Sequence, residues 1–239
     1  MKSAFKSDIG KKRGNNEDFC YADTDNGIFL LADGMGGHQA GEVASRLAVE
    51  EAYTYLKDRL PQTNDEKDIS KLLVEALLKA HDAVNKESKT DLNLMGMGTT
   101  FVEMIIKDEK AFICHVGDSR AYHLQNGIRQ ITKDHTVGDY LVEHGLMKRE
   151  DVPPQKWHTL TQAVGVSENI VPELNHVKLK PGDILLLCSD GLTDMLTDQE
   201  IEGIIQNHKE ELKQAVNTLI EEANRKGGKD NITVVLIEV

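Results

Sequence analysis

The chain has 239 residues, enough for one domain with a substantial core, and it is 39% hydrophobic and 28% charged. Its formal net charge of -12 argues against nucleic acid or an anionic membrane as the main partner, because both attract basic surfaces. The sequence has no run near the roughly 18 to 20 apolar residues of a membrane span and no apolar signal-peptide core at its start. We therefore expect one domain, residues 1–239, in the cytoplasm.

The first half of the chain predicts a buried strand, two helices and a group of strands. Residues 28–32 form an apolar run that ends at an Asp-Gly pair, as a strand that stops at a turn does. Residues 39–60 and 68–87 repeat apolar side chains at helical spacing, so two amphipathic helices should pack side by side on a sheet. From Gly98 the pattern is strand-like and predicts an antiparallel meander. Its expected strands are 99–106, 111–116, 121–124 and 128–132.

The second half begins with residues 133–173, which are richer in polar residues, proline and histidine. We predict a mobile surface subdomain here, with a short helix at 137–145. A buried strand at 184–188 follows, and a capping-box pattern at Thr197 predicts a helix over 198–208. The last expected elements are a helix over 210–226 and a strand over 232–239.

This order of elements indicates the layers of the fold. Strands that pair antiparallel and helices that come in adjacent pairs favour two sheets packed face to face with helices on the outer sides. The expected class is therefore α+β, as a four-layer α-β-β-α sandwich of two antiparallel sheets flanked by helix pairs.

Carboxylates recur beside glycine or asparagine in five segments that lie far apart in the sequence. Taken alone, a strand that ends in Asp-Gly is usually only a turn. Five such sites, each where a strand meets a loop, instead predict functional groups that converge if the sheets stack. Oxygen ligands suit hard cations such as Mg²⁺ and Mn²⁺, so the pattern is typical of a dinuclear metal centre. The segments are 13–18 (RGNNED), 32–37 (ADGMGG), 116–120 (VGDSR), 188–192 (CSDGL) and 228–232 (GKDNI).

In order and spacing these motifs resemble the metal-dependent Ser/Thr protein phosphatases of type 2C, also called the PPM family, in their compact bacterial form. The resemblance runs from Arg13 to Asn231, nearly the whole chain. It implies an α-β-β-α sandwich with the metal site at one edge of the sheets, and hydrolysis of phosphoserine and phosphothreonine on proteins. The implied partners are phosphorylated proteins and an opposing bacterial Ser/Thr kinase. The implied cofactor is two Mn²⁺ or Mg²⁺ ions, with a third and weaker ion in bacterial members.

The resemblance also assigns the ligands of the two main ions. It implies that Asp33 bridges both cations, that Asp190 and Asp230 complete one, and that the carbonyl of Gly34 binds the other. Glycine suits position 34, since a backbone carbonyl reaches a cation only where side chains do not crowd it. Two cations roughly 3.5 to 4 Å apart lower the pKa of a bridging water, so hydroxide can attack phosphorus without a phosphoenzyme.

Other positions receive supporting roles from the same resemblance. Glu17 and Asp18 are implied to hold metal-bound water, and Asp118 is implied to support the third ion together with Asp190. Arg13 matches the family's phosphate-binding arginine, whose planar fork suits two phosphate oxygens. The alternative for Arg13 is an exposed side chain within a short basic run.

The proton donor for the leaving alcohol is an open question. Animal relatives carry a histidine directly after the Asp-Gly pair, where this chain has Met35. His38 lies three residues on and is the candidate acid, with a structural or merely exposed histidine as the alternative. Asp194 is a further candidate for the third ion, with a turn role as its alternative. The segment 133–173 corresponds to the variable flap of bacterial members, and we predict that 136–157 moves when substrate binds.

Two other functions compete with phosphoprotein hydrolysis. A pseudoenzyme that binds phosphoproteins without turnover is disfavoured, because all the acidic motifs are present. A metal-dependent phosphodiesterase or nuclease uses the same two-metal chemistry, but the acidic charge and the lack of a basic aromatic groove argue against a nucleic-acid substrate. The sequence has no long apolar seam for an obligate assembly, so we expect a monomer.

Overall fold

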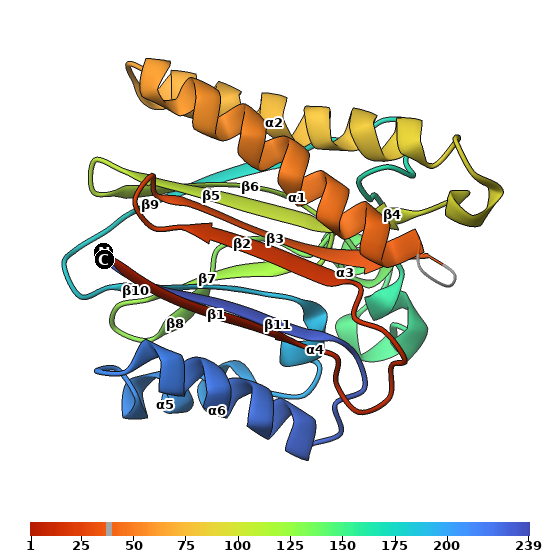
Figure 1. Cartoon of the computed structure of the whole chain (residues 1–239). Coiled ribbons are helices and arrows are strands. Elements are labelled where there is room, and N and C mark those ends of the chain that lie inside the picture. The colour runs from red at the N-terminus through yellow and green to blue at the C-terminus, as the bar shows by residue number, and fades with distance from the viewer. Residues whose placement is uncertain (37–39) are drawn as a thin grey trace.

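A computed structural model describes residues 1–36 and 40–239 and shows four layers (Figure 1). Two antiparallel sheets pack face to face, and a pair of helices covers the outer side of each (Figure 1). The α-β-β-α sandwich expected from the sequence is confirmed. No helix among the described residues is long and apolar enough to cross a membrane.

The first sheet has six strands, in the order β2-β3-β5-β6-β9 with β4 paired to β3. Helices α1 (Ala40–Arg59) and α2 (Glu66–Glu87) lie on its outer face. Buried alanines such as Ala48 and Ala76 let the helices approach each other and the sheet closely. The strands are β2 (Asp18–Asp23), β3 (Ile28–Met35), β4 (Gly98–Thr99), β5 (Phe101–Lys107), β6 (Lys110–Val116) and β9 (Glu173–Lys178).

The second sheet has five strands in the order β1-β11-β10-β7-β8. It is covered by α5 (Asp198–Asn207) and α6 (Leu212–Arg225), and the short helix α4 (Asp190–Thr193) follows β10 directly. The capping box at Thr197 is present, with Glu200 as its partner. The strands are β1 (Lys2–Asp8), β7 (Arg120–Leu124), β8 (Ile128–Gln130), β10 (Ile184–Cys188) and β11 (Ile232–Glu238).

The predicted meander over 99–132 is wrong, because the chain changes sheets at Gly117. β5 and β6 pair in the first sheet, whereas β7 and β8 pair in the second. Gly117 has φ 107, a conformation that L side chains rarely adopt, and it turns the chain from one sheet to the other. This crossing carries Asp118 to the end of the sandwich. The predicted single strand 99–106 is also interrupted, at Thr100.

Three strands have no counterpart in the sequence analysis: β1, β2 and β9. All three are edge strands of their sheets. An edge strand exposes part of its surface and carries polar residues, so it lacks the continuous apolar run that marks a central strand. The four long helices, in contrast, begin and end within two residues of the predicted bounds.

The flap, residues 133–173, lies between β8 and β9 and packs on itself. It contains α3 (Val137–Glu143), which confirms the predicted short helix, and the turns η3 (Arg149–Asp151) and η4 (Pro154–His158). The Arg149 guanidinium lies 4.4 Å from the centre of the Trp157 ring and 3.2 Å from a carboxylate oxygen of Asp139. Two further short turns, η1 (Leu60–Gln62) and η2 (Leu92–Leu94), flank α2.

Candidate metal centre

Aspartates from four distant segments meet in a cavity of about 700 Å³ at one end of the two sheets. We call Asp33, Asp118, Asp190 and Asp230 the carboxylate cluster. Glu17, Gly34 and Arg13 also line the cavity, and Asp194 adds another carboxylate. The flap contributes the facing wall through His158, Thr159, Leu160, Thr161, Gln162, Ala163, Val166 and Ser167.

Asp33 is held near the end of β3 through its backbone. Its amide N donates to Thr100 Oγ1 over 3.0 Å, and its carbonyl accepts from the Thr100 amide over 2.9 Å and from Thr99 Oγ1 over 2.8 Å. The pair Thr99-Thr100 therefore aligns the strand that carries Asp33. A Cβ at Gly34 would collide with the Gly41 carbonyl oxygen, so only glycine fits at this position.

Asn231 organises the loop that carries Glu17 and Arg13. Its side-chain nitrogen donates to the carbonyls of Ile9 and Asn15 over 3.0 and 2.9 Å, and its Oδ1 accepts from the Glu17 amide over 2.8 Å. Asn231 is 4% exposed, so these bonds are shielded from water. In the sequence, Asn231 stands out only as part of the motif at 228–232. Its role depends on contacts more than 200 positions away, which no local pattern reveals.

Loss of hydration raises the pKa of both Asp33 and Asp190 well above the ordinary value. Neighbouring carboxylates add to the effect, since Asp18 acts on Asp33 and Asp118 acts on Asp190. Burial, aided by Asp134, raises the pKa of Asp118 to about 6.

One carboxylate oxygen of Asp190, Oδ1, is buried without a hydrogen-bond partner among the described residues. A buried carboxylate that lacks a partner is costly, and a cation would offset that cost. The donor set consists of oxygens alone, which fits a hard divalent cation such as Mg²⁺ or Mn²⁺. The residues present therefore suit the predicted ions.

Asp18 differs from the other predicted ligands, because it does not line this cavity. It lies opposite Asp33 in the pairing of β2 with β3 and is 6% exposed. Its Oδ2 accepts from Ser189 Oγ and Thr233 Oγ1, both over 2.7 Å, while its Oδ1 has no partner among the described residues. Asp18 thus connects the first sheet to the second at the position paired with Asp33. The other predicted ligands, in contrast, all line the cavity: Glu17, Asp33, Gly34, Asp118, Asp190 and Asp230.

Arg13 lies at the edge of the cavity with its side chain 51% exposed. Its Nη2 donates to Asp230 Oδ2 over 2.6 Å. Hydrogen bonding to Asp230 raises the pKa of Arg13. The guanidinium is a positive group beside the carboxylate cluster, where it can reach an anion in the cavity.

The candidate acid His38 lies outside the described residues. Met35 lines the cavity and lies with Val166 against Gly98. His158 from the flap also lines the cavity, and its Nδ1 is 3.6 Å from Asp194 Oδ2. His158 is not predicted from the sequence, since one histidine in a polar stretch belongs to no pattern.

Comparison with known proteins gives one consistent result. The family model described as protein phosphatase 2C matches residues 10–234. The serine/threonine phosphatase stp of Listeria monocytogenes serotype 4b (strain F2365) is 38% identical over 247 residues, which cover 100% of this chain and 96% of that protein.

Solved structures agree in fold. The serine/threonine phosphatase of S. agalactiae superposes with a TM-score of 0.91 at 31% identity, over 100% of this chain and 99% of that one. The catalytic domain of the serine threonine protein phosphatase PstP, solved with two manganese ions, has a TM-score of 0.85 at 36% identity, over 99% and 97% of the two chains.

Proposed function

The chain belongs to the protein phosphatase 2C family, and from that premise we propose that its carboxylate cluster holds the divalent cations used to hydrolyse phosphoserine and phosphothreonine in proteins. The protein is a metal-dependent serine/threonine phosphatase. Beyond that activity, we propose the role of individual residues in binding the ions and the substrate.

Asp33, Asp190, Asp230 and the carbonyl of Gly34 would hold two ions, with Asp118 and Asp190 at a third. The observation that supports this assignment most strongly is the buried Oδ1 of Asp190, which has no hydrogen-bond partner among the residues that the structure describes and lies within a group of like charges. When bound, the ions neutralise phosphoryl charge and make hydroxide available near neutral pH. The oxygen donors suit Mn²⁺ and Mg²⁺ alike.

The protein's own side chains bind and orient the substrate. Arg13 offers N–H donors to phosphate oxygens at the mouth of the cavity, as a planar guanidinium does well. The flap lines the facing wall and so limits the approach of substrate and water from that side. His38 remains our candidate for donating a proton to the leaving alcohol.

The proposal extends to the whole molecule. We propose that residues 1–239 form one domain that carries the site, and the core shared by the two sheets supports this. We propose that the protein acts as a monomer in the cytoplasm on phosphorylated proteins and opposes a Ser/Thr kinase.

The direct test compares wild type with Asp33→Ala on a phosphothreonine peptide in the presence of Mn²⁺. We expect Mn²⁺-dependent phosphate release by the wild type and its loss in the variant. Asp25→Ala is the matched control, because Asp25 is an exposed aspartate in the turn between β2 and β3. Equal turnover by wild type and Asp33→Ala, or activity that survives a chelator, would contradict the proposal. Cleavage of single-stranded DNA under the same conditions would instead support a nuclease.

A further inference from the structure

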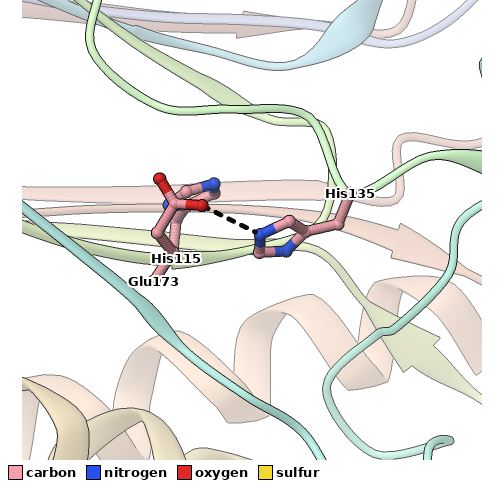
Figure 2. A group of neighbouring side chains, drawn as sticks. All are labelled: His115, His135 and Glu173. Carbon is pink, nitrogen blue, oxygen red and sulfur yellow. Dashed lines mark ion pairs between the residues drawn. The ribbon is translucent and has the colours of Figure 1, made fainter. Parts of the chain in front are cut away.

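A second group of ionisable side chains consists of His115, His135 and Glu173 (Figure 2). His115 on β6 and Glu173 on β9 are neighbours across these two strands. His135 comes from the start of the flap, and its ring stacks on His115 with 4.6 Å between the ring centres. Its Nε2 lies 3.6 Å from a carboxylate oxygen of Glu173 (Figure 2).

Hydrogen bonds determine which nitrogen of the His135 ring carries the proton. Nδ1 lies 3.2 Å from the Gly117 amide N, and a backbone N–H can only donate. Nδ1 is therefore the acceptor, and the proton is on Nε2, on the side of Glu173. Burial, with a contribution from His115, lowers the pKa of His135 to about 4, so the ring is neutral near pH 7.

Gln162 supports the same tautomer of His135. Its Oε1 accepts from the Val171 amide over 2.8 Å, and its Nε2 donates to the Val171 carbonyl over 3.1 Å. These two bonds orient the Gln162 amide, and its Nε2 then lies 3.0 Å from His135 Nδ1 as a second donor. Both neighbours of Nδ1 are therefore donors.

This arrangement argues against a second metal centre at the three side chains, although they are close enough to share an ion. His115 Nε2 donates to the Lys133 carbonyl over 2.8 Å, and its buried Nδ1 has no partner among the described residues. His135, however, carries its proton on Nε2 and cannot bind an ion through that atom. Only His115 Nδ1 then offers an imidazole lone pair, whereas an ion held by both histidines would need one from each. The contacts of His135 with Gly117 point to another role.

His135 holds Gly117 by two bonds. Besides the ring contact, its backbone N–H donates to the Gly117 carbonyl over 3.0 Å. On the opposite side, a Cβ at Gly117 would lie 2.7 Å from the Thr100 Cβ, so the glycine is confined between Thr100 and His135. The next residue is Asp118, whose carboxylate lines the cavity of the carboxylate cluster.

The contacts on either side of His135 reinforce this attachment. Arg120 binds Asp134 through Nε over 3.0 Å and through Nη2 over 2.6 Å. The His135 carbonyl accepts from both the amide and the hydroxyl of Thr161, over 2.8 and 3.0 Å. His135 thus joins the first and last parts of the flap to the turn that carries Asp118.

We propose that His135 is a positioning residue for Asp118: its Nδ1 fixes the Gly117 turn, and that turn aims the Asp118 carboxylate into the cavity. Glu173 supports this role by facing the protonated Nε2 (Figure 2). The inference rests on the proposed function in one respect, that Asp118 holds the third cation.

Two variants separate the functions of the two ring nitrogens. In His135→Asn the side-chain oxygen takes the place of Nδ1 and keeps an acceptor for the Gly117 amide. In His135→Gln the amide reaches the place of Nε2, and the acceptor at Nδ1 is lost. Asp118→Asn serves as the reference for loss of the third ion, and thermal unfolding verifies that each variant is folded.

The readout is Mn²⁺ binding, followed by the electron paramagnetic resonance signal of the free ion. We expect His135→Gln to weaken the weakest Mn²⁺ site by about 10-fold or more, with the two tighter sites unchanged. His135→Asn should bind all ions as wild type does. Equal affinities in wild type and both variants, or the same loss in both variants, would overturn the positioning role.

The remaining outcomes distinguish this proposal from the proposed function. A wild-type protein that binds two ions but no third overturns the role of Asp118 and this inference, and leaves the two-ion centre in place. A wild-type protein that binds no Mn²⁺ overturns both. Independently of any variant, ¹H–¹⁵N NMR correlations of the His135 ring should show the proton on Nε2, and a proton on Nδ1 would overturn the inference.

Discussion

Two aspartates that flank strand β10 have opposite surroundings. Asp183, just before the strand, accepts from His123 Nε2 over 2.8 Å and from the Lys180 amide over 3.0 Å. Burial raises its pKa, but these hydrogen bonds outweigh burial, so the pKa of Asp183 lies below the ordinary value. Asp190, just after the strand, has one oxygen without a hydrogen-bond partner in the described part of the chain. Loss of hydration, together with neighbouring like charges, raises its pKa well above the ordinary value.

This contrast separates a structural carboxylate, Asp183, from one that we propose binds a cation, Asp190. The charge of Asp183 is satisfied by the protein itself, whereas the charge of Asp190 is not and faces a cavity. Glu103 is a third case, since it is 0% exposed and neither of its carboxylate oxygens has a hydrogen-bond partner among residues 1–36 and 40–239. Burial raises the pKa of Glu103 well above its ordinary value, so its neutral form is favoured.

The largest effect should come from Asp190→Asn. This change removes a proposed ion ligand without changing the size of the side chain. Loss of a residue that only hydrogen-bonds a metal ligand typically lowers metal affinity or activity by roughly 10- to 100-fold. Mn²⁺-dependent turnover of a phosphothreonine peptide should therefore fall by more than that in Asp190→Asn. Asp183→Asn is the matched control at the other end of β10 and should retain turnover. Equal loss of turnover in the two variants would refute the distinction between them.

For the free energy of unfolding, Asp183→Asn should have the larger effect and Asp190→Asn the smaller one. Asp183→Asn should lower the free energy of unfolding by about 2 to 3 kcal/mol, because hydrogen bonds to a buried charged group are lost. Asp190→Asn should cost less, since it removes like-charge repulsion. Urea unfolding of both variants without added metal measures the difference. A larger loss in Asp190→Asn than in Asp183→Asn would contradict the comparison.

Glu103→Met should stabilise the protein by about 1 to 2 kcal/mol at pH 8, because it removes a buried polar group without partners. The pKa of Glu103 is raised in the folded state. The contribution of this carboxyl to the free energy of unfolding is therefore fully present below its ordinary pKa of about 4.3. That contribution is lost as the pH rises toward the folded-state pKa. The advantage of Glu103→Met should therefore grow with pH. Unfolding measured from pH 5 to pH 8, with the exposed Glu210→Met as control, tests this, and a gap that shrinks with pH would contradict it.

The smallest effect should come from Arg13→Lys. Among the described residues, Asp230 is the one carboxylate of the cluster that forms a salt bridge. Its partner is Arg13, whose side chain is half exposed. Lysine retains the charge but loses the planar fork, so about 0.5 to 1.5 kcal/mol of phosphate binding should be lost. We expect KM for the phosphopeptide to rise less than about tenfold with kcat nearly unchanged. A fall in kcat with an unchanged KM would assign Arg13 to another step.

The sequence predicted the parts of the fold that carry a strong local pattern. The long helices and β10 have continuous apolar periodicity, and the acidic motifs occur at fixed offsets from glycine. The edge strands β1, β2 and β9 have no such pattern and are not predicted, and the position of Asp18 opposite Asp33 is missed together with β2. The contacts of His135 and Asn231 also join distant segments and can be recognised only in the folded chain.

The central claim is that Asp33, Asp190 and Asp230 enclose a pair of divalent ions. Crystals grown with Mn²⁺ and measured for anomalous scattering test this claim most directly. The account predicts two strong anomalous peaks between these three side chains, with any third and weaker peak at Asp118. Ordered crystals in which the peaks lie only at other carboxylates, or in which this cavity holds none, would contradict it.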